Sequence, residues 1–250
     1  VSQKLTSTEQ DKEELFVGGE TYIPVDNSVS NGDESVNLIT AILGSKTNFL
    51  RSFLYKIQTY IGHGHISITG NSASAHILTI KALSSPLLGS RALGIGDEII
   101  TTPNNVAIIN SCRSIGVVPI LVDVDLNTML PDPIEIEMNI VEGRTKAIIL
   151  SSVNGSCLIG EEIREIADDF SIMFVEDLGY GFGGNVQGVP VGSYADVAIY
   201  SFHSALLGDA GVVICKPYLV HELIQKAMVD ADTATWVGLG ASPMMYAYLD

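Results

Sequence analysis

The sequence predicts an α/β fold, a three-layer α/β/α sandwich around a mostly parallel sheet. Short, continuous aliphatic runs recur along the 250 residues, and amphipathic, helix-like segments separate them. Strands that are apolar on both faces are typical of a parallel sheet covered by helices on either side. The hydrophobic fraction of 46% and the chain length fit one large domain with a well-filled core.

Each element is predicted from its hydrophobic pattern. In the segment 49–61, for example, Phe49, Phe53 and Ile57 recur every four residues, which indicates a helix. The predicted elements, in order, are helices at 34–43 and 49–61, a strand at 65–69, a helix at 72–83, a strand at 98–102, a helix at 104–115, strands at 119–125 and 146–152, a helix at 161–170, strands at 172–177, 195–202 and 211–216, and a helix at 219–228.

Composition and charge limit the possible partners. The formal net charge of −16 argues against nucleic acid, because that binding depends on Lys and Arg. No apolar stretch reaches the roughly 20 residues that cross a bilayer, so no membrane contact is expected. Residues 1–21 form a polar N-terminal leader without a signal-peptide core, which predicts a cytoplasmic protein. The large domain is expected at 22–230 and a truncated tail at 231–250.

The three cysteines, Cys112, Cys157 and Cys215, are predicted to be buried, reduced thiols. They lack the spacing of a metal site, and each lies in or beside an apolar run. We therefore expect no metal.

The stretch VEDLGYGFGG at 175–184 contains Gly179, Gly181 and Gly184 in the spacing GxGxxG. A dinucleotide-binding turn of this kind must be followed at once by a helix that receives the pyrophosphate. The continuation NVQGVPVGSYAD contains Gly188 and Pro190 and cannot form that helix. The glycines are predicted to form a loop.

Asp177 then stands at the end of a predicted parallel strand, where ligands of such sheets bind. From the residues alone it is either a strand-end aspartate that caps a turn or a functional carboxylate. The next strand brings Ser201 and His203 to the same edge, and a serine-rich turn at 72–74 opens a helix. His203 itself fits a surface position at a strand end. Together the aspartate, the serine and a helix N-terminus suit a phosphorylated heteroaromatic ring whose pyridinium nitrogen faces the carboxylate.

These motifs resemble a known family. The segments ALSSPLLGSRALGIGDEIIT (82–101), GVVPILVDVD (116–125), TKAIILSS (145–152) and 175–202 are similar to the DegT/DnrJ/EryC1/StrS sugar aminotransferases. The segment SSPLLGSRAL favours the CDP-4-keto-6-deoxyglucose 3-dehydratase branch of that family. The resemblance implies the large domain of the type I, aspartate-aminotransferase-like fold, with pyridoxal phosphate or pyridoxamine phosphate as cofactor. It also implies a role in deoxysugar or lipopolysaccharide sugar biosynthesis, with the small C-terminal domain largely absent here.

The resemblance assigns cofactor-binding roles to five positions. Asp177 matches the aspartate that binds the pyridinium nitrogen, and Ser201 matches a serine that contacts the phosphate. The phosphate-binding turn aligns with 72–75, so that Ala73 and Ser74 fall within it while its leading glycine is lost. Asn105 stands where relatives have an aromatic residue that stacks on the cofactor ring.

The catalytic position departs from the family pattern. Relatives have lysine, or histidine in the dehydratase branch, five residues after this serine, and Leu206 stands there. Leucine can neither attach covalently to a cofactor nor move a proton. Two hypotheses stay open: a degenerate relative with lost or impaired catalysis, and an active dehydratase or aminotransferase that acts on a nucleotide-linked 4-keto-6-deoxysugar. The resemblance also implies a homodimer, or pairing with an active paralogue.

Overall fold

The computed structural model describes residues 16–17, 20–21, 49–62, 64–152, 160–204 and 208–234. The chain divides into two compact units, 1–45 and 46–250. In the first unit, β1 (Phe16–Val17) and β2 (Glu20–Thr21) pair as a short antiparallel hairpin. The predicted helix at 34–43 lies outside the described residues, and the domain boundaries at 21 and 230 stay predictions.

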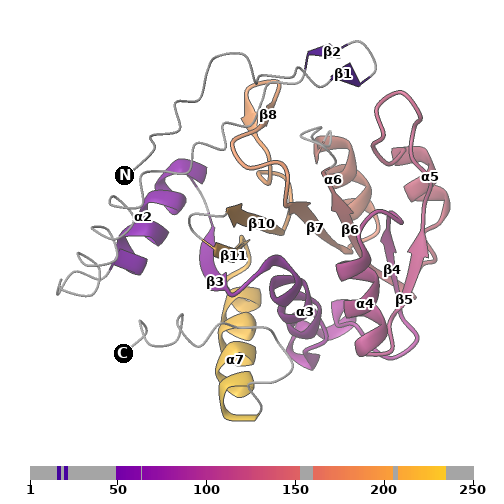
Figure 1. Ribbon diagram of the computed structural model, residues 1–250. Coiled ribbons are helices and arrows are strands. Elements are labelled where there is room, and N and C mark those ends of the chain that lie inside the picture. Colours follow the sequence, from indigo (N-terminus) through magenta and orange to yellow (C-terminus); the bar gives the residue numbers. More distant parts are fainter. Residues whose placement is uncertain are drawn as a thin grey trace, which may run out of the picture. The chain divides into compact units, whose positions relative to one another are not determined.

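A seven-stranded sheet forms the centre of the second unit, in the order β3-β11-β10-β7-β6-β4-β5 (Figure 1). Strands β4 to β7 and β10 run parallel to one another, while β11 is antiparallel to both β10 and β3. The mostly parallel sheet is therefore confirmed. The strand bounds are β3 His65–Thr69, β4 Glu98–Thr101, β5 Val118–Leu121, β6 Thr145–Ser151, β7 Met173–Leu178, β10 Val197–Ser204 and β11 Gly208–Cys215.

Helices cover both faces of this sheet, as the sequence predicts. Buried residues of α3, α4 and α7 pack on one face, and those of α2, α5 and α6 pack on the other. The bounds are α2 Phe49–Ile61, α3 Ser72–Leu83, α4 Val106–Ser114, α5 Pro133–Met138, α6 Gly160–Asp169, α7 Tyr218–Ala234 and a 3₁₀ helix, η1, at Pro86–Arg91. Within the described residues, no helix combines the length and the apolar character that a membrane span requires.

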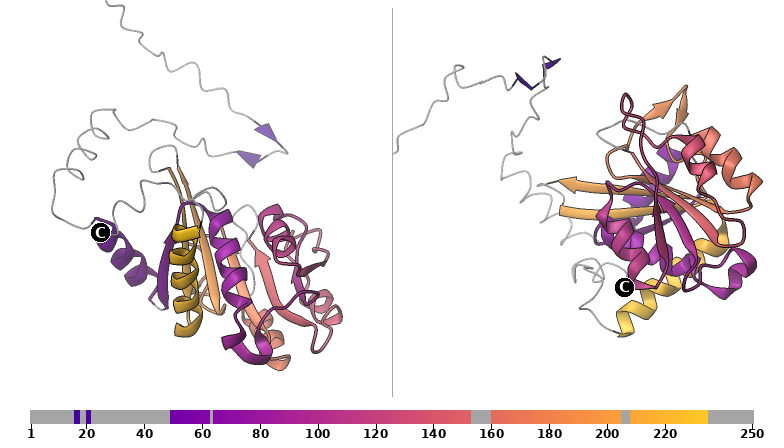
Figure 2. Two further views of the ribbon diagram at one scale, coloured as in Figure 1. Left: turned by 90° about the horizontal axis from the view of Figure 1, so that it is seen from below. Right: turned by 90° about the vertical axis from the view of Figure 1, so that its right-hand side faces the viewer.

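Strands β10 and β11 extend beyond their neighbours as a two-stranded ribbon (Figure 2). The register of β7 with β10 ends at Tyr200, whereas β10 continues to pair with β11 as far as Ser204 and Gly208. His203 lies in this extension, opposite Asp209. Leu206, at the connection between the two strands, lies outside the described residues.

No helix follows the glycine cluster, which confirms the loop. A small hairpin, β8 (Asn185–Val186) with β9 (Val189–Pro190), follows instead. Two hydrogen bonds hold the end of this loop on the sheet: Tyr200 Oη donates to the Val191 carbonyl at 2.9 Å, and the Gly192 amide donates to Glu176 Oε2 at 2.8 Å. Gly192 has φ of 85°, and a Cβ there would lie 2.6 Å from Tyr200 Oη, so the close approach requires glycine.

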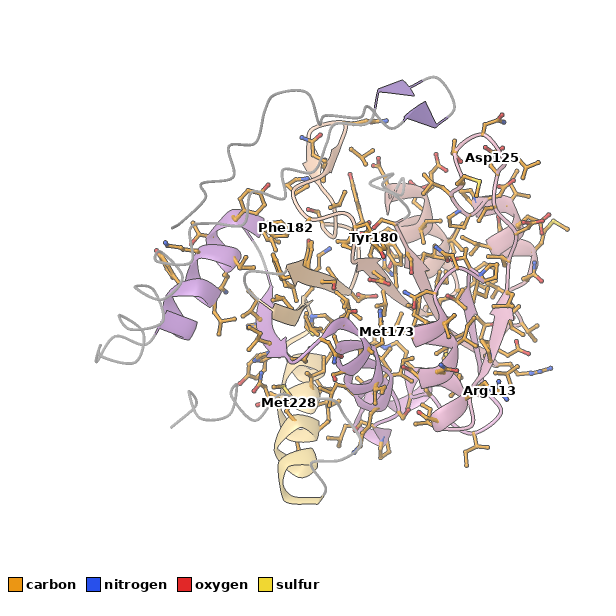
Figure 3. The ribbon with its side chains drawn as sticks, viewed as in Figure 1. Arg113, Asp125, Met173, Tyr180, Phe182 and Met228 are labelled. Atoms are coloured by element: carbon orange, nitrogen blue, oxygen red, sulfur yellow. The ribbon has the colours of Figure 1, made fainter. Side chains whose placement is uncertain are left out.

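Aromatic contacts also hold this loop. The ring of Phe182, labelled in Figure 3, lies 5.4 Å from Tyr60 of α2, 5.7 Å from Tyr200 and 4.8 Å from Phe202 of β10. The loop after β7 is therefore fixed against both the sheet and α2.

Two of the three cysteines are buried and free, as predicted: Cys112 and Cys215. Burial raises the pKa of Cys112 to about 11 and that of Cys215 to about 12, so both stay protonated at neutral pH. Cys157 lies outside the described residues.

Asp196 holds the start of β7 in place. Its Oδ2 accepts the Phe174 amide at 2.9 Å and the Arg164 Nη1 of α6 at 2.9 Å. Arg164 also pairs at 2.6 Å with Asp168, whose side chain is 68% exposed. The two aspartates share one arginine in different environments, so they form a matched pair for measurement.

We expect Asp196→Ala to lower the free energy of unfolding by about 2–4 kcal/mol, because it leaves a buried strand amide and a partly buried arginine without their acceptor. Asp168→Ala is expected to cost less than about 1 kcal/mol, as for an exposed helix pair. Urea denaturation at neutral pH measures both values. Equal costs for the two variants would contradict this assignment.

Glu176 gives the fold a pH dependence. Burial raises its pKa from the model-compound value of 4.5 to about 7, although the Gly192 hydrogen bond and the charge of Lys216 act in the opposite direction. A carboxyl group with a raised pKa in the folded state stabilises the fold below its unfolded pKa and loses that contribution as the pH rises through about 7. We expect Glu176→Gln to flatten the fall in thermal stability between about pH 4.5 and pH 7. An unchanged profile in that variant would show that Glu176 does not titrate in this range.

Candidate functional site

Asp177 lies near the carboxyl end of β7 and is only 5% exposed. In the sheet it stands between Ser151 of β6 and Ile199 of β10. Because side chains alternate along a strand, Asp177 and Glu176 point to opposite faces. Asp177 points to the face that carries α3 and α4, and Glu176 to the face of α6.

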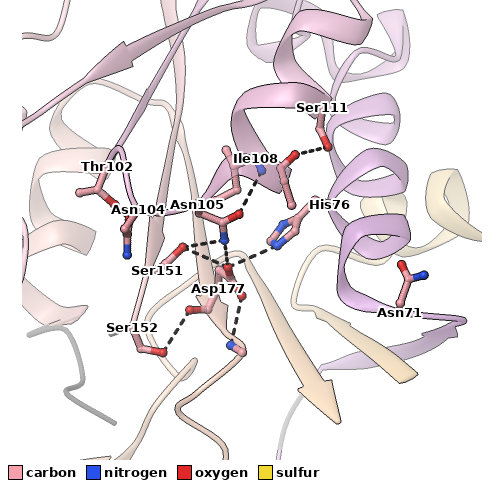
Figure 4. Close-up of polar contacts among 12 residues, drawn as sticks. Asn71, His76, Thr102, Asn104, Asn105, Ile108, Ser111, Ser151, Ser152 and Asp177 are labelled. Atoms are coloured by element: carbon pink, nitrogen blue, oxygen red, sulfur yellow. Dashed lines mark hydrogen bonds and ion pairs between the residues drawn. The ribbon is translucent and has the colours of Figure 1, made fainter. Parts of the chain in front are cut away.

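Four hydrogen-bond donors converge on the Asp177 carboxylate (Figure 4). Ser151 Oγ lies 3.0 Å and His76 Nε2 3.3 Å from Oδ2, and Asn105 Nδ2 also donates to that oxygen. The Gly179 amide donates to Oδ1 at 3.1 Å. The donors come from α3, the start of α4, β6 and the loop after β7, so the site depends on four separate parts of the fold.

These contacts set the charge state of Asp177. Burial alone raises the pKa of a carboxyl group, but the hydrogen bonds and charge of His76, with those of Ser151 and Gly179, outweigh it and hold the Asp177 pKa below its ordinary value. Asp177 is therefore ionised at neutral pH. It can serve as the partner of a protonated ring nitrogen.

Asp177 lies in the wall of a cavity of about 510 Å³. This volume falls in the range of small-molecule sites. The cavity is lined by Asn71, Ser72, His76, Asn104, Asn105, Val106, Ala107, Ser151, Ser152, Asp177, Gly179, Tyr180 and Ser201.

Three of the five predicted cofactor-binding residues meet in this cavity: Asp177, Ser201 and Asn105. The arrangement of Asn105 differs from ring stacking. It is the N-cap of α4: its Oδ1 accepts the Ile108 amide at 3.2 Å, while its Nδ2 donates to Asp177 and, at 3.0 Å, to Ser151 Oγ. Asn105 therefore ties the start of α4 to the carboxylate.

The other two predicted residues do not line the cavity. Ala73 is exposed, and Ser74 is buried in the first turn of α3, where its amide donates to Asn71 Oδ1 at 2.8 Å. Ser72 lines the cavity in their place. The predicted phosphate turn thus reaches the cavity through its first residue.

Sequence reasoning missed His76, Ser151 and Ser152. His76 lies in an apolar helix pattern and is 2% exposed, so the sequence suggests a core residue. The two serines end the predicted strand TKAIILSS, and that position at the carboxyl edge, beside Asp177, was a usable signal.

The residues that line the cavity fit a phosphorylated heteroaromatic ring. An ionised carboxylate forms one wall, and the hydroxyls of Ser72 and Ser201 can donate to a phosphate, while Ser152 Oγ donates to the Asp177 carbonyl at 3.3 Å. The Ser74 amide is capped by Asn71, but the amides of Ser72 and Ala73 at the start of α3 have no acceptor within the helix, which favours an anion there. A Cβ at Gly179 would lie 3.5 Å from Asp177 Oδ1 and 3.6 Å from Ser201 Cβ, so glycine keeps open the space between these two residues. Within the described part of the chain, no group of three or more His, Cys, Asp or Glu side chains could hold a metal ion.

Comparison with known proteins identifies relatives of this chain. It is 31% identical over 218 residues to the lipopolysaccharide biosynthesis protein RfbH of Salmonella typhimurium, an alignment that covers 84% of this chain and 50% of RfbH. It is also 31% identical over 218 residues to the dTDP-4-dehydro-2,6-dideoxy-D-glucose 3-dehydratase of Saccharopolyspora spinosa, covering 84% of this chain and 47% of that protein. The chain thus spans about half the length of these curated relatives.

A solved structure has the same fold. The Bacillus subtilis protein NtdA, determined with bound pyridoxamine phosphate, matches with a TM-score of 0.66 and 26% identity, covering 77% of this chain and 43% of NtdA. The model of the DegT/DnrJ/EryC1/StrS aminotransferase family matches residues 31–228. That match covers most of the chain and includes every residue of the cavity, so the chain belongs to the DegT/DnrJ/EryC1/StrS aminotransferase family.

Proposed function

We propose that the chain binds pyridoxamine phosphate or pyridoxal phosphate non-covalently in the Asp177 cavity, and that its catalysis is lost or impaired. It is then a divergent member of the nucleotide-sugar aminotransferases and 3-dehydratases. The observation that carries the proposal is the buried, ionised Asp177 in a cavity that also contains Ser201 and the start of α3.

The residues of this cavity support binding. A carboxylate that faces the ring nitrogen keeps that nitrogen protonated, and the bound cofactor then supplies an electron sink for substrate chemistry. Ser201, Ser72 and the first amides of α3 would hold the phosphate. None of the residues that line the described cavity is Lys or Arg, so the phosphate would be bound by neutral donors.

The loss of catalysis rests on Leu206. At the position where relatives have lysine or histidine, the leucine side chain of this chain can neither attach to the cofactor nor transfer a proton. No lysine lines the described cavity to replace it. Two described lysines are committed elsewhere: Lys146 Nζ donates to the Ser90 carbonyl at 3.0 Å, and Lys216 Nζ donates to the Ser193 carbonyl.

The alternative is an active dehydratase or aminotransferase that acts on a nucleotide-linked 4-keto-6-deoxysugar. The converging donors around Asp177 support this version as well, because an active enzyme of this class needs the same ionised carboxylate. The two relatives, one a lipopolysaccharide biosynthesis protein and one a deoxysugar 3-dehydratase, support this substrate class. Cytoplasmic location and assembly as a homodimer, or with an active paralogue, belong to both versions of the proposal.

The first test is binding of pyridoxamine phosphate to Asp177 variants. We expect Asp177→Ala to weaken binding at least tenfold, because a charge-assisted hydrogen bond is worth about 1.5–3 kcal/mol and about 1.4 kcal/mol is a factor of ten. Asp177→Asn keeps the shape but removes the charge, and it should lose most of the same affinity. Ser201→Ala, which removes one phosphate donor among several, should cost less.

Isothermal titration calorimetry measures these affinities, and thermal melts check that each variant folds. Leu206→Ala is the control and should bind as the parent does. Equal affinity of Asp177→Ala and the parent would leave Asp177 as a strand-end cap and overturn the proposed site.

The second test asks whether the cofactor becomes covalently attached. After incubation with pyridoxal phosphate and reduction with borohydride, we expect no stoichiometric pyridoxyl adduct on any single lysine, because Leu206 has no amine. Mass spectrometry of tryptic peptides measures this, with a lysine-containing family member treated in parallel as the positive control. Full modification of one lysine in this chain would contradict the assignment of Leu206.

A further inference from the structure

We propose that His76 is a positioning residue for Asp177: its Nε2 donates to Oδ2 and fixes the carboxylate so that Oδ1 serves the ring nitrogen of the ligand. This inference rests on the proposed function. It adds a residue for which neither composition nor motif gives a signal.

The hydrogen bonds of Asp177 are unevenly divided between its two oxygens. Oδ2 accepts from His76, Ser151 and Asn105, whereas Oδ1 accepts from the Gly179 amide. A carboxylate oxygen has about two lone-pair sites, so Oδ2 is saturated and Oδ1 is the oxygen with capacity for a further donor. The three contacts to Oδ2 therefore determine which oxygen the ligand meets.

Among the described hydrogen bonds, His76 has fewer other partners than Asn105 has. Asn105 also caps α4, through the Ile108 amide, and it donates to Ser151. His76 instead is a residue of α3, and it is 2% exposed. Its imidazole contacts the carboxylate and lines the cavity. An ionised carboxylate only accepts, so Nε2 carries the proton, and the tautomer follows from the contact.

The surroundings of Asp177 contain few other titratable groups. His76 of α3 faces it directly, and Tyr180, in the loop after β7, is the other titratable side chain among the described residues that line the cavity. From α4, β6 and β10 the groups that line the cavity are Asn105, Val106, Ala107, Ser151, Ser152 and Ser201, all uncharged. The phosphate of the ligand also titrates in this range, so the pair of His76 and Asp177 is read from the difference in acid dependence between the parent and a His76 variant that bind the same ligand.

The test measures pyridoxamine phosphate affinity between pH 4 and pH 8 for the parent chain, His76→Leu and His76→Gln. We expect His76→Leu to bind about five- to twentyfold more weakly at neutral pH, since one hydrogen bond to a charged group is lost while two donors to Oδ2 remain. Its loss of binding on acidification should begin at a higher pH, because the hydrogen bond that lowers the Asp177 pKa is gone. His76→Gln, whose amide nitrogen lies about as far along the side chain as Nε2, should restore both values to near those of the parent.

Thr79→Val is the matched control. Thr79 is buried one turn further along the same helix, and its Oγ1 has no hydrogen-bond partner within the described structure. The substitution changes the helix core but not Asp177, so affinity and acid dependence should stay those of the parent. Should His76→Leu fail to fold, His76→Asn, whose amide is too short to reach Oδ2, is expected to lose affinity while His76→Gln keeps it.

Two failures can be told apart. A parent chain that does not bind pyridoxamine phosphate at all overturns the proposed function and this inference with it. A parent that binds, together with a His76→Leu variant of the same affinity and acid dependence, overturns this inference alone and makes His76 a core residue.

Discussion

The ionised Asp177 carboxylate is the constraint on which the rest of the site depends. A charge that is 5% exposed is expensive unless donors surround it, and here they come from α3, the start of α4, β6 and the loop after β7. Each donor requires its element to approach the end of β7 closely. The same contacts that neutralise the cost of burial therefore also define the walls of the cavity.

Adjacent residues on β7 illustrate how side-chain alternation separates two tasks. Asp177 faces α3 and α4 and has a lowered pKa, while Glu176 faces the other side and has a raised pKa. Glu176 finds one backbone donor, the Gly192 amide, and that contact anchors the loop that follows the site. One carboxylate is thus kept charged beside the cavity, and its neighbour ties the loop to the sheet at the cost of a pH-dependent stability.

Much of the fold could be predicted because its signals are local. Aliphatic runs and helix periodicity located the strands and helices of the described sheet, and the glycine loop followed from Gly188 and Pro190. The antiparallel direction of β11 was not predictable in this way, since a buried strand has the same apolar pattern in either direction. The hairpin of β8 and β9 and the short helix α5 were missed because two-residue strands and a six-residue helix show too little periodicity.

The residues of the site, too, could be predicted only where their signal is local. Asp177 and Ser201 were recognisable because each stands near the predicted end of a strand at the ligand edge, and the end of an apolar run is a local property. His76 was not, because the contact between His76 and Asp177 joins residues about a hundred positions apart, and a histidine inside an apolar helix has no distinguishing pattern. Asn105 matched a family position, but its amide caps α4 and binds Asp177, a geometry that the position alone does not specify.

This arrangement separates holding a cofactor from reacting with it. The described donors around Asp177 and the described hydroxyls of the cavity come from the sheet edge and the helix starts. Under the proposed function, leucine at position 206 lacks a reactive group, while the described contacts to Asp177 stay in place. In physical terms, a chain of this family can lose its chemistry and still keep every described group that would bind the ring nitrogen and the phosphate.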